Sequence, residues 1–396
     1  MFGLKHILDP VSIDEFLADY AGRKAVHIHG PEDKFENLYS WAEVNNVLNG
    51  MRPSYEGVRL VHDTETLGQH EFRRLNHWLS RGATLVINHV QHIDPIAEQF
   101  AESLANDMNS SVNINGYVSF PSRQGFKCHY DTHDVFVVQT AGEKEWKVFE
   151  PTRTFPLDRD PADEKDKYAR PTEGEYLSCI LTPGDVLYIP RGHWHYAMST
   201  ESCIHLTVSY SNRSALDFLV WLLNEMRDRD EFLRQDLPLC RTRCLLGDRP
   251  DDPLEERLEQ FRRHMHELID RPDLAEKIIH WAQMENPLRQ TFQLPELAEL
   301  DRNPVARGAV FKVPANQKFI TRHDPESGDI QLLARGRGVL LHHVPTELIE
   351  LMLGAANGFS GDELMSACPD VSWDNTQKML QSLFVNGLIV MHDRSA

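Results

Sequence analysis

Two short stretches decide the fold of this chain: HYD at His129–Asp131 and GDVLYIPRGHWH at Gly184–His195. The first stretch places an imidazole and a carboxylate two residues apart, and side chains two apart on a β-strand project from the same face. In the second stretch a Gly-Asp turn leads into the strand VLYI, and Pro-Arg-Gly breaks that strand and delivers His195 at its end. We therefore expect His129, Asp131 and His195 to converge from neighbouring strands of a small barrel.

The chemistry of these three side chains points to a metal ion. Two imidazoles and one carboxylate can hold one face of an iron(II) ion and leave the other face open, which is typical of non-haem iron oxygenases. A lone His-x-Asp pattern occurs by chance, but the second stretch, with predicted strands between the two, makes the combination specific. His193 is an alternative third ligand, but the position of His195 at the end of the strand favours His195.

Short strands surround both stretches and predict a mainly β core. Alternating or continuously apolar runs are separated by Gly/Pro turns, a pattern typical of a barrel or jelly roll. These predicted strands are residues 112–120, 135–139, 145–149, 176–181, 186–189 and 204–210. The preceding part of the chain mixes helices and strands, including a predicted strand at residues 25–29 and an amphipathic helix at residues 95–108.

The chain changes character twice after the predicted β core. From Ser214 to about residue 300 the apolar residues recur at helical spacing, and such stripes form either a bundle core or a dimer face. Three predicted helices at residues 347–353, 360–365 and 372–384, followed by a strand at 387–391, favour a winged helix. Acidic residues outnumber basic ones from Pro304 onward, which argues against direct DNA binding. A role in protein interaction or scaffolding fits this segment better.

Composition limits the classes of protein to which the chain can belong. Its 396 residues suffice for two or three domains. No apolar run approaches the roughly 20 residues of a membrane helix, the first residues do not resemble a signal peptide, and six cysteines form no disulfide framework. We predict a cytoplasmic protein without a membrane partner. The formal net charge of −19 either serves solubility alone or attracts a basic protein partner.

Several motifs resemble the cupin-type JmjC oxygenases, and most closely their ribosomal-oxygenase branch, which hydroxylates ribosomal proteins. They are Asn115-Gly116-Tyr117, QGFKCHYDTHDVF at residues 124–136, Gln139, GEKEW at residues 142–146, and the second stretch at residues 184–195. The resemblance spans roughly residues 5–212. It implies a double-stranded β-helix (cupin/JmjC jelly roll) oxygenase domain at 1–212, a helical, dimerising domain at 213–300 and a winged-helix-like domain at 301–396.

The resemblance also assigns site residues. His129, Asp131 and His195 become the catalytic iron(II) ligands, with 2-oxoglutarate next to the iron. Lys144 matches the lysine that pairs with the distal carboxylate of 2-oxoglutarate, and a cation is needed because that carboxylate enters a largely apolar barrel. Tyr117 matches the tyrosine whose hydroxyl shares this carboxylate, and Asn115 is a candidate cosubstrate or substrate contact. Without the resemblance, Lys144 would read as a surface lysine on a strand edge.

These features predict an enzyme that uses Fe(II), 2-oxoglutarate and O2 to hydroxylate a protein or peptide, with a basic ribosomal protein as the leading substrate and a homodimer as the leading assembly. Two alternatives stay open. The same chemistry could act on a natural-product precursor peptide or a tRNA base, or the barrel could be a catalytically inactive, metal-binding adaptor. Cys128, where the family commonly has proline, and Gly116, where a larger residue is usual, leave the iron ligands intact and put the substrate in doubt.

Overall fold

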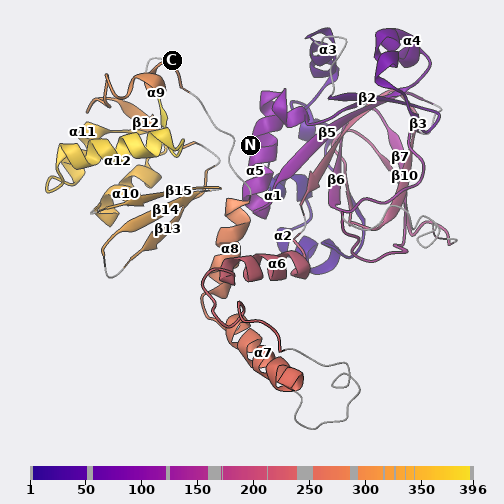
Figure 1. The fold of residues 1–396 in the computed structure, drawn as a ribbon. Helices are drawn as coiled ribbons and strands as arrows, with labels where there is room; N and C mark the ends of the chain where they lie inside the picture. Colours follow the sequence, from indigo (N-terminus) through magenta and orange to yellow (C-terminus); the bar gives the residue numbers. More distant parts are fainter. Residues whose placement is uncertain are drawn as a thin grey trace. The chain divides into compact units, whose positions relative to one another are not determined.

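The computed structural model of the chain is shown in Figure 1. It describes residues 3–50, 57–121, 125–158, 171, 173–211, 213–238, 253–285, 293–314, 317–324, 327–334, 336–342 and 344–392. The chain divides into two compact units, Met1–Ser211 with Asn286–Ala396, and Asn212–Glu285.

Two antiparallel sheets form the β core. The larger has the strand order β1-β9-β6-β11-β5-β4-β2-β3, and the smaller has the order β10-β7-β8. The strands of the larger sheet are β1 (Val26–Ile28), β2 (Val58–His62), β3 (Glu65–Thr66), β4 (Thr84–Ile87), β5 (Val112–Ser119), β6 (Asp134–Ala141), β9 (Val186–Ile189) and β11 (Cys203–Tyr210). Those of the smaller sheet are β7 (Lys144–Phe149), β8 (Leu177–Leu181) and β10 (Trp194–Ser199). The strands predicted from alternating or continuously apolar runs are therefore confirmed, whereas β2, β3 and β10 were not predicted.

The larger sheet is covered on both faces, which explains why β6 is a continuous apolar run. Val135 and Val137 pack with Trp146 of β7 in a cluster that joins the two sheets. Phe136 and Val138 point to the opposite face, where they join the main hydrophobic cluster. A strand buried on both faces shows no alternation of apolar and polar residues.

Helices supply the cover for that second face. Helix α5 (Pro95–Met108) has the bounds predicted from its sequence, because Asp94 caps it by accepting a hydrogen bond from the Ala97 backbone and Pro95 occupies its first position. Its buried face, which includes Phe100, packs in the main cluster together with helix α1 (Leu4–Leu8), and Figure 1 shows α1 and α5 beside β5. The remaining helices of this region are α2 (Ile13–Glu15), α3 (Trp41–Gly50), α4 (Leu75–Ser80), a π-helix at Phe16–Tyr20, and 3-10 helices at Glu32–Phe35, Gln69–Arg74 and Val90–His92.

The second unit is helical, as its apolar stripes predicted. Its helices are α6 (Ala215–Met226), α7 (Pro253–Ile269) and α8 (Leu274–Met284). A capping box between Ser214 and Asp217 starts α6. A small cluster that includes Leu222 and Met226 is buried. Helix α6 exposes four aliphatic side chains: Leu216, Leu219, Val220 and Leu223.

The C-terminal segment has its own hydrophobic cluster. It contains two three-stranded sheets, ordered β16-β12-β17 and β13-β14-β15. The three predicted helices are present, and the predicted strand at 387–391 is the shorter β17. The elements are α9 (Glu296–Glu299), β12 (Val310–Lys312), β13 (Ile320–His323), β14 (Ile330–Ala334), β15 (Arg337–Leu341), α10 (Thr346–Gly354), β16 (Phe359–Ser360), α11 (Gly361–Ala367), α12 (Trp373–Val385) and β17 (Val390–Met391). None of the helices described here or above combines the length and apolarity needed to cross a membrane.

Candidate active site

The three predicted metal ligands converge. One ligand atom from each of His129, Asp131 and His195 lies within 4.8 Å of the other two. The His195 Nε2 atom is 3.6 Å from the Asp131 Oδ2 atom, and the two imidazole centroids are 4.5 Å apart. Ions that bind nitrogen and oxygen donors at about 2.0–2.2 Å hold neighbouring donors roughly 2.8–3.6 Å apart. The arrangement therefore fits a single ion with two imidazole ligands and one carboxylate ligand.

Backbone pairing, and not a shared strand, brings these ligands together. His129 and His195 form an isolated antiparallel bridge, in which the His129 N–H donates to the His195 carbonyl at 3.1 Å and the His195 N–H donates to the His129 carbonyl at 2.7 Å. The Gly192 N–H donates to the Asp131 carbonyl at 2.9 Å. Three backbone hydrogen bonds therefore link the HYD stretch to the stretch that carries His195.

Two details of the predicted geometry are wrong. His129 and Asp131 do not share a strand, because only His129 is in a bridge and Asp131 lies in the loop before β6. His195 does not end β9. The break at Gly192, where φ is +87°, lets the chain begin the new strand β10, in which His195 pairs with Val148 of β7.

Backbone carbonyls orient both imidazoles. The His129 Nδ1 atom lies 2.8 Å from the Lys127 carbonyl oxygen, and the His195 Nδ1 atom lies 3.0 Å from the His193 carbonyl oxygen. Nδ1–H then donates in each ring and leaves Nε2 as the ligand atom. Burial, aided by the neighbouring His129, lowers the pKa of His195 to about 4. His195 is therefore a neutral imidazole at neutral pH, the form that binds metals.

The alternative ligand His193 is engaged elsewhere. Its Nδ1 atom lies 2.9 Å from the hydroxyl oxygen of Tyr176, which in turn accepts a hydrogen bond from the Ala25 backbone. Burial lowers the pKa of His193 to about 4. This side chain therefore belongs to a buried network beside β1.

A cavity of about 360 Å³ opens beside the three ligands. All six candidate site residues line it, together with side chains that the sequence analysis did not single out. Its lining includes His129, Asp131, His195, Lys144, Tyr117 and Asn115, and also Arg59, Phe126, His133, Val135, Val137, Trp146, His205, Thr207 and Ser209. The structure thus brings the candidates to one place, while their individual roles remain predictions.

Lys144 is a buried cation in the cavity wall. It opens β7, is 6% exposed, and its ammonium donates to the Ser119 hydroxyl at 2.9 Å. Burial lowers its pKa to about 8. An anion bound in the cavity would stabilise the protonated form, because an isolated buried charge is costly. Ser119 was missed, although its position two residues after Tyr117 on β5 places it on the same strand face.

Tyr117 and Asn115 meet polar residues of β11 across the sheet. Tyr117 pairs with His205, and Asn115 pairs with Thr207. The rings of Tyr117 and His205 are stacked with centroids 4.8 Å apart. Burial raises the pKa of Tyr117 to about 12, so its hydroxyl keeps its proton at neutral pH. The Asn115 side-chain oxygen accepts a hydrogen bond from the His89 backbone.

His205 is the main residue that the sequence analysis missed. It is 2% exposed and lines the cavity, and burial holds its pKa well below the ordinary value for histidine. The available signal was the spacing of His205, Thr207 and Ser209, which places three polar side chains on one face of β11.

Comparison with known proteins shows which families and folds the chain is similar to. Residues 87–218 match the JmjC domain. The chain is 25% identical over 335 residues to ribosomal oxygenase 1 of Danio rerio, covering 78% of this chain and 59% of that protein. It is 34% identical over 165 residues to ribosomal oxygenase 2 of Bos taurus, covering 39% and 34% respectively. The chain thus spans about three fifths or less of the length of these curated relatives.

A solved structure extends the likeness to almost the whole chain. YcfD, a ribosomal oxygenase from Escherichia coli solved in complex with cobalt and 2-oxoglutarate, superposes with a TM-score of 0.58 at 17% identity. The match covers 97% of this chain and 99% of that one, which establishes a common fold. The predicted cupin core, with a large antiparallel sheet and flanking helices, is confirmed. The chain therefore contains a region that matches the JmjC domain, is similar in sequence to proteins named ribosomal oxygenases, and shares the fold of one of them.

Proposed function

We propose that this protein is an Fe(II)- and 2-oxoglutarate-dependent oxygenase that hydroxylates a side chain of a protein or peptide, with a ribosomal protein as the leading substrate. The observation that carries the proposal is the convergence of His129, Asp131 and His195 on a cavity that also holds the buried cation Lys144. The names of two relatives support an oxygenase: ribosomal oxygenase 1 of Danio rerio, and a bifunctional lysine-specific demethylase and histidyl-hydroxylase of Dictyostelium discoideum.

The residues of the cavity would have three separate roles in this reaction. His129, Asp131 and His195 would hold the iron by one face and leave the other face to cosubstrate, and the iron would supply the oxygen chemistry that side chains cannot perform. Lys144 would neutralise the distal carboxylate of 2-oxoglutarate, with the protonated Tyr117 hydroxyl as a further donor. Val135, Val137 and Trp146 would keep water away from the reacting atoms.

We propose a basic protein substrate because the chain carries a net charge of −19. A natural-product precursor peptide or a tRNA base would use the same cavity, although a nucleic acid would be repelled by the acidic surface. An inactive metal-binding adaptor would keep the three ligands without affinity for 2-oxoglutarate.

We further propose three domains, at residues 1–212, 213–300 and 301–396, in a cytoplasmic homodimer. The exposed aliphatic side chains of α6 support helical-domain dimerisation, since such a face is normally covered. Helices α10–α12 with the β16-β12-β17 sheet support a winged-helix-like last domain. Its surplus of acidic over basic residues favours a protein contact over DNA.

Removal of two metal ligands should abolish turnover. The variant His129→Ala/Asp131→Ala retains a single imidazole, so we expect no succinate formation from labelled 2-oxoglutarate in the presence of Fe(II) and ascorbate. The exposed His70, replaced by alanine, serves as the control and should keep full turnover. Succinate formation by the double variant at the control rate would refute the proposed oxygenase activity.

Removal of the buried cation should weaken the binding of 2-oxoglutarate and leave the binding of the metal unchanged. Lys144→Ala should raise the Kd of 2-oxoglutarate about 100-fold or more in anaerobic titrations with the metal present, because the distal carboxylate would lose its charged partner. Lys144→Arg should recover part of the loss. If the unaltered protein binds metal but not 2-oxoglutarate, the adaptor alternative is correct.

The lowered pKa of Lys144 predicts a pH dependence of binding. Only the protonated lysine pairs with a carboxylate, and its pKa in the free protein is about 8. Affinity for 2-oxoglutarate should therefore be constant below this pH and fall about tenfold per unit above it. A profile in Lys144→Ala that shows the same fall would assign the effect to another group.

Mass spectrometry of ribosomal proteins from a deletion strain tests the substrate. We expect one ribosomal peptide to become lighter by one oxygen atom when the gene is removed, and to regain that mass when the intact gene, but not the double ligand variant, is restored. If the masses of all ribosomal proteins are unchanged, the ribosomal substrate is wrong, and a precursor peptide or a tRNA base becomes the leading substrate.

A further inference from the structure

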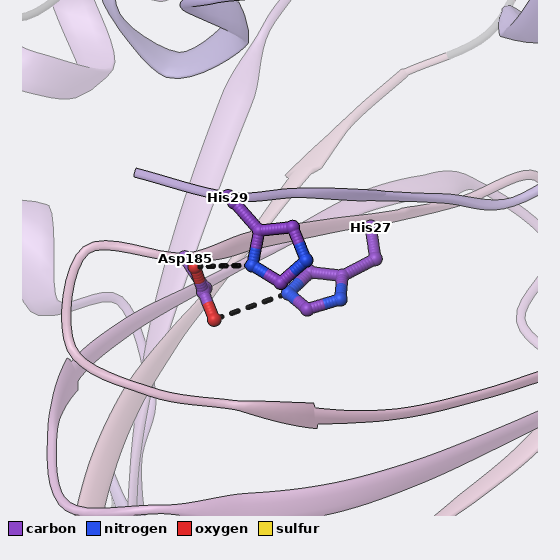
Figure 2. A group of neighbouring side chains, drawn as sticks. All are labelled: His27, His29 and Asp185. Atoms are coloured by element: carbon purple, nitrogen blue, oxygen red, sulfur yellow. Dashed lines mark ion pairs between the residues drawn. The ribbon is translucent and has the colours of Figure 1, made fainter. Parts of the chain in front are cut away.

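A second cluster of metal-ligating side chains lies at the opposite end of β9 from the break that leads to His195. Its members are His27, His29 and Asp185, and one ligand atom from each lies within 4.8 Å of the other two. Figure 2 shows both imidazoles turned toward the Asp185 carboxylate. The reaction proposed above uses none of these residues.

The strand register places the three side chains together. His27 lies in β1 and His29 follows its last residue, so the two project to one side. β1 pairs antiparallel with β9, and Ile28 faces Val186, which brings the preceding Asp185 to His29. The turns beside them approach so closely that a Cβ atom at Gly30 or Gly184 would overlap the backbone of the other segment. Both glycines are therefore required for this contact.

The carboxylate is buried and held in position. Asp185 has a side chain that is 3% exposed. Its Oδ2 atom accepts hydrogen bonds from the backbone and hydroxyl of Thr182, at 3.0 and 3.1 Å, and its Oδ1 atom accepts one from the Gly30 backbone at 3.2 Å. An ionised carboxylate has about four lone-pair positions, so one remains on Oδ1. Metal-binding carboxylates are commonly oriented by hydrogen bonds of this kind.

The distances between donor atoms fit a shared ion. His27 Nε2 is 3.1 Å from Asp185 Oδ2, and His29 Nδ1 is 3.4 Å from Asp185 Oδ1. Donors bound tetrahedrally at about 2.0–2.1 Å lie roughly 3.3–3.4 Å apart, which matches the separation of His29 Nδ1 from Oδ1, the carboxylate oxygen that keeps a lone pair. Despite its short approach, the buried Nε2 atom of His27 has no hydrogen bond of acceptable geometry within the described part of the chain. A shared ion would give this buried nitrogen atom a partner.

We propose that His27, His29 and Asp185 bind a late first-row divalent ion, represented by Zn2+, at a second site. Imidazole and carboxylate donors suit such ions, whereas Mg2+ and Ca2+ favour oxygen ligands. The His29 side chain is 79% exposed, so the ion reaches the site from solvent and water completes its shell. The ion ties β1 to the turn before β9, a structural role separate from the proposed oxygenase reaction.

The test uses the full chain with the first site disabled by His129→Ala/Asp131→Ala. After removal of metal with a chelator, Zn2+ binding is measured by competition with a chromophoric chelator. We expect this background to bind one Zn2+ per chain, and the further change His29→Ala to weaken that binding by about tenfold or more. His29→Cys, which restores a ligand, should recover tight binding.

The matched control is His70→Ala in the same background, because the His70 side chain is 80% exposed and also lies beside a carboxylate, Glu71. The control should keep its Zn2+ and should be stabilised by Zn2+ in thermal unfolding, while His29→Ala should show no such shift. The proposal is wrong if the background binds no Zn2+, or if His29→Ala and His70→Ala bind it equally. Either result leaves the oxygenase proposal intact, since the background cannot catalyse that reaction.

Discussion

The backbone bridge between His129 and His195 is the contact on which the candidate active site depends. Its two hydrogen bonds, with the third from Gly192 to Asp131, fix the main chain at all three ligands. Because the main chain is fixed at all three ligands, binding of an ion requires little further ordering of the backbone. Joining His129 to His195, which lie far apart in sequence, costs chain entropy. The strand pairs β6–β9 and β7–β10 on either side of the bridge offset that cost.

Around this bridge the barrel combines an apolar shell with a few buried polar groups. Val135 and Val137 of β6 and Trp146 of β7 belong to the core cluster and also line the cavity. Lys144 and His205 are buried in the same wall, and burial lowers the pKa of each. Such groups are costly in an apolar interior, so their presence marks the cavity as a place for a charged ligand more strongly than its size does.

β9 links the two clusters of ligand side chains. Asp185 precedes this four-residue strand, and the turn at its other end leads to His195. β9 lies between β1 and β6 in the sheet, so its position is set on both sides by hydrogen bonds. An interaction that holds β1 against β9 thus acts on the same strand that leads the chain toward His195 of the candidate active site.

The sequence by itself predicted most strands of the β core, the bounds of helix α5 and the three ligand residue types, because these depend on local periodicity, turn residues and motif spacing. The candidate Lys144 came from the family resemblance. The strand β10, the bridge at His129, the hydrogen bond from Lys144 to Ser119 and the position of His205 in the cavity wall were decided only by the tertiary structure. Period-two alternation says which side chains share a face of one strand. Which faces meet depends on pairing between distant strands, such as Tyr117 of β5 opposite His205 of β11, and no local pattern contains that register.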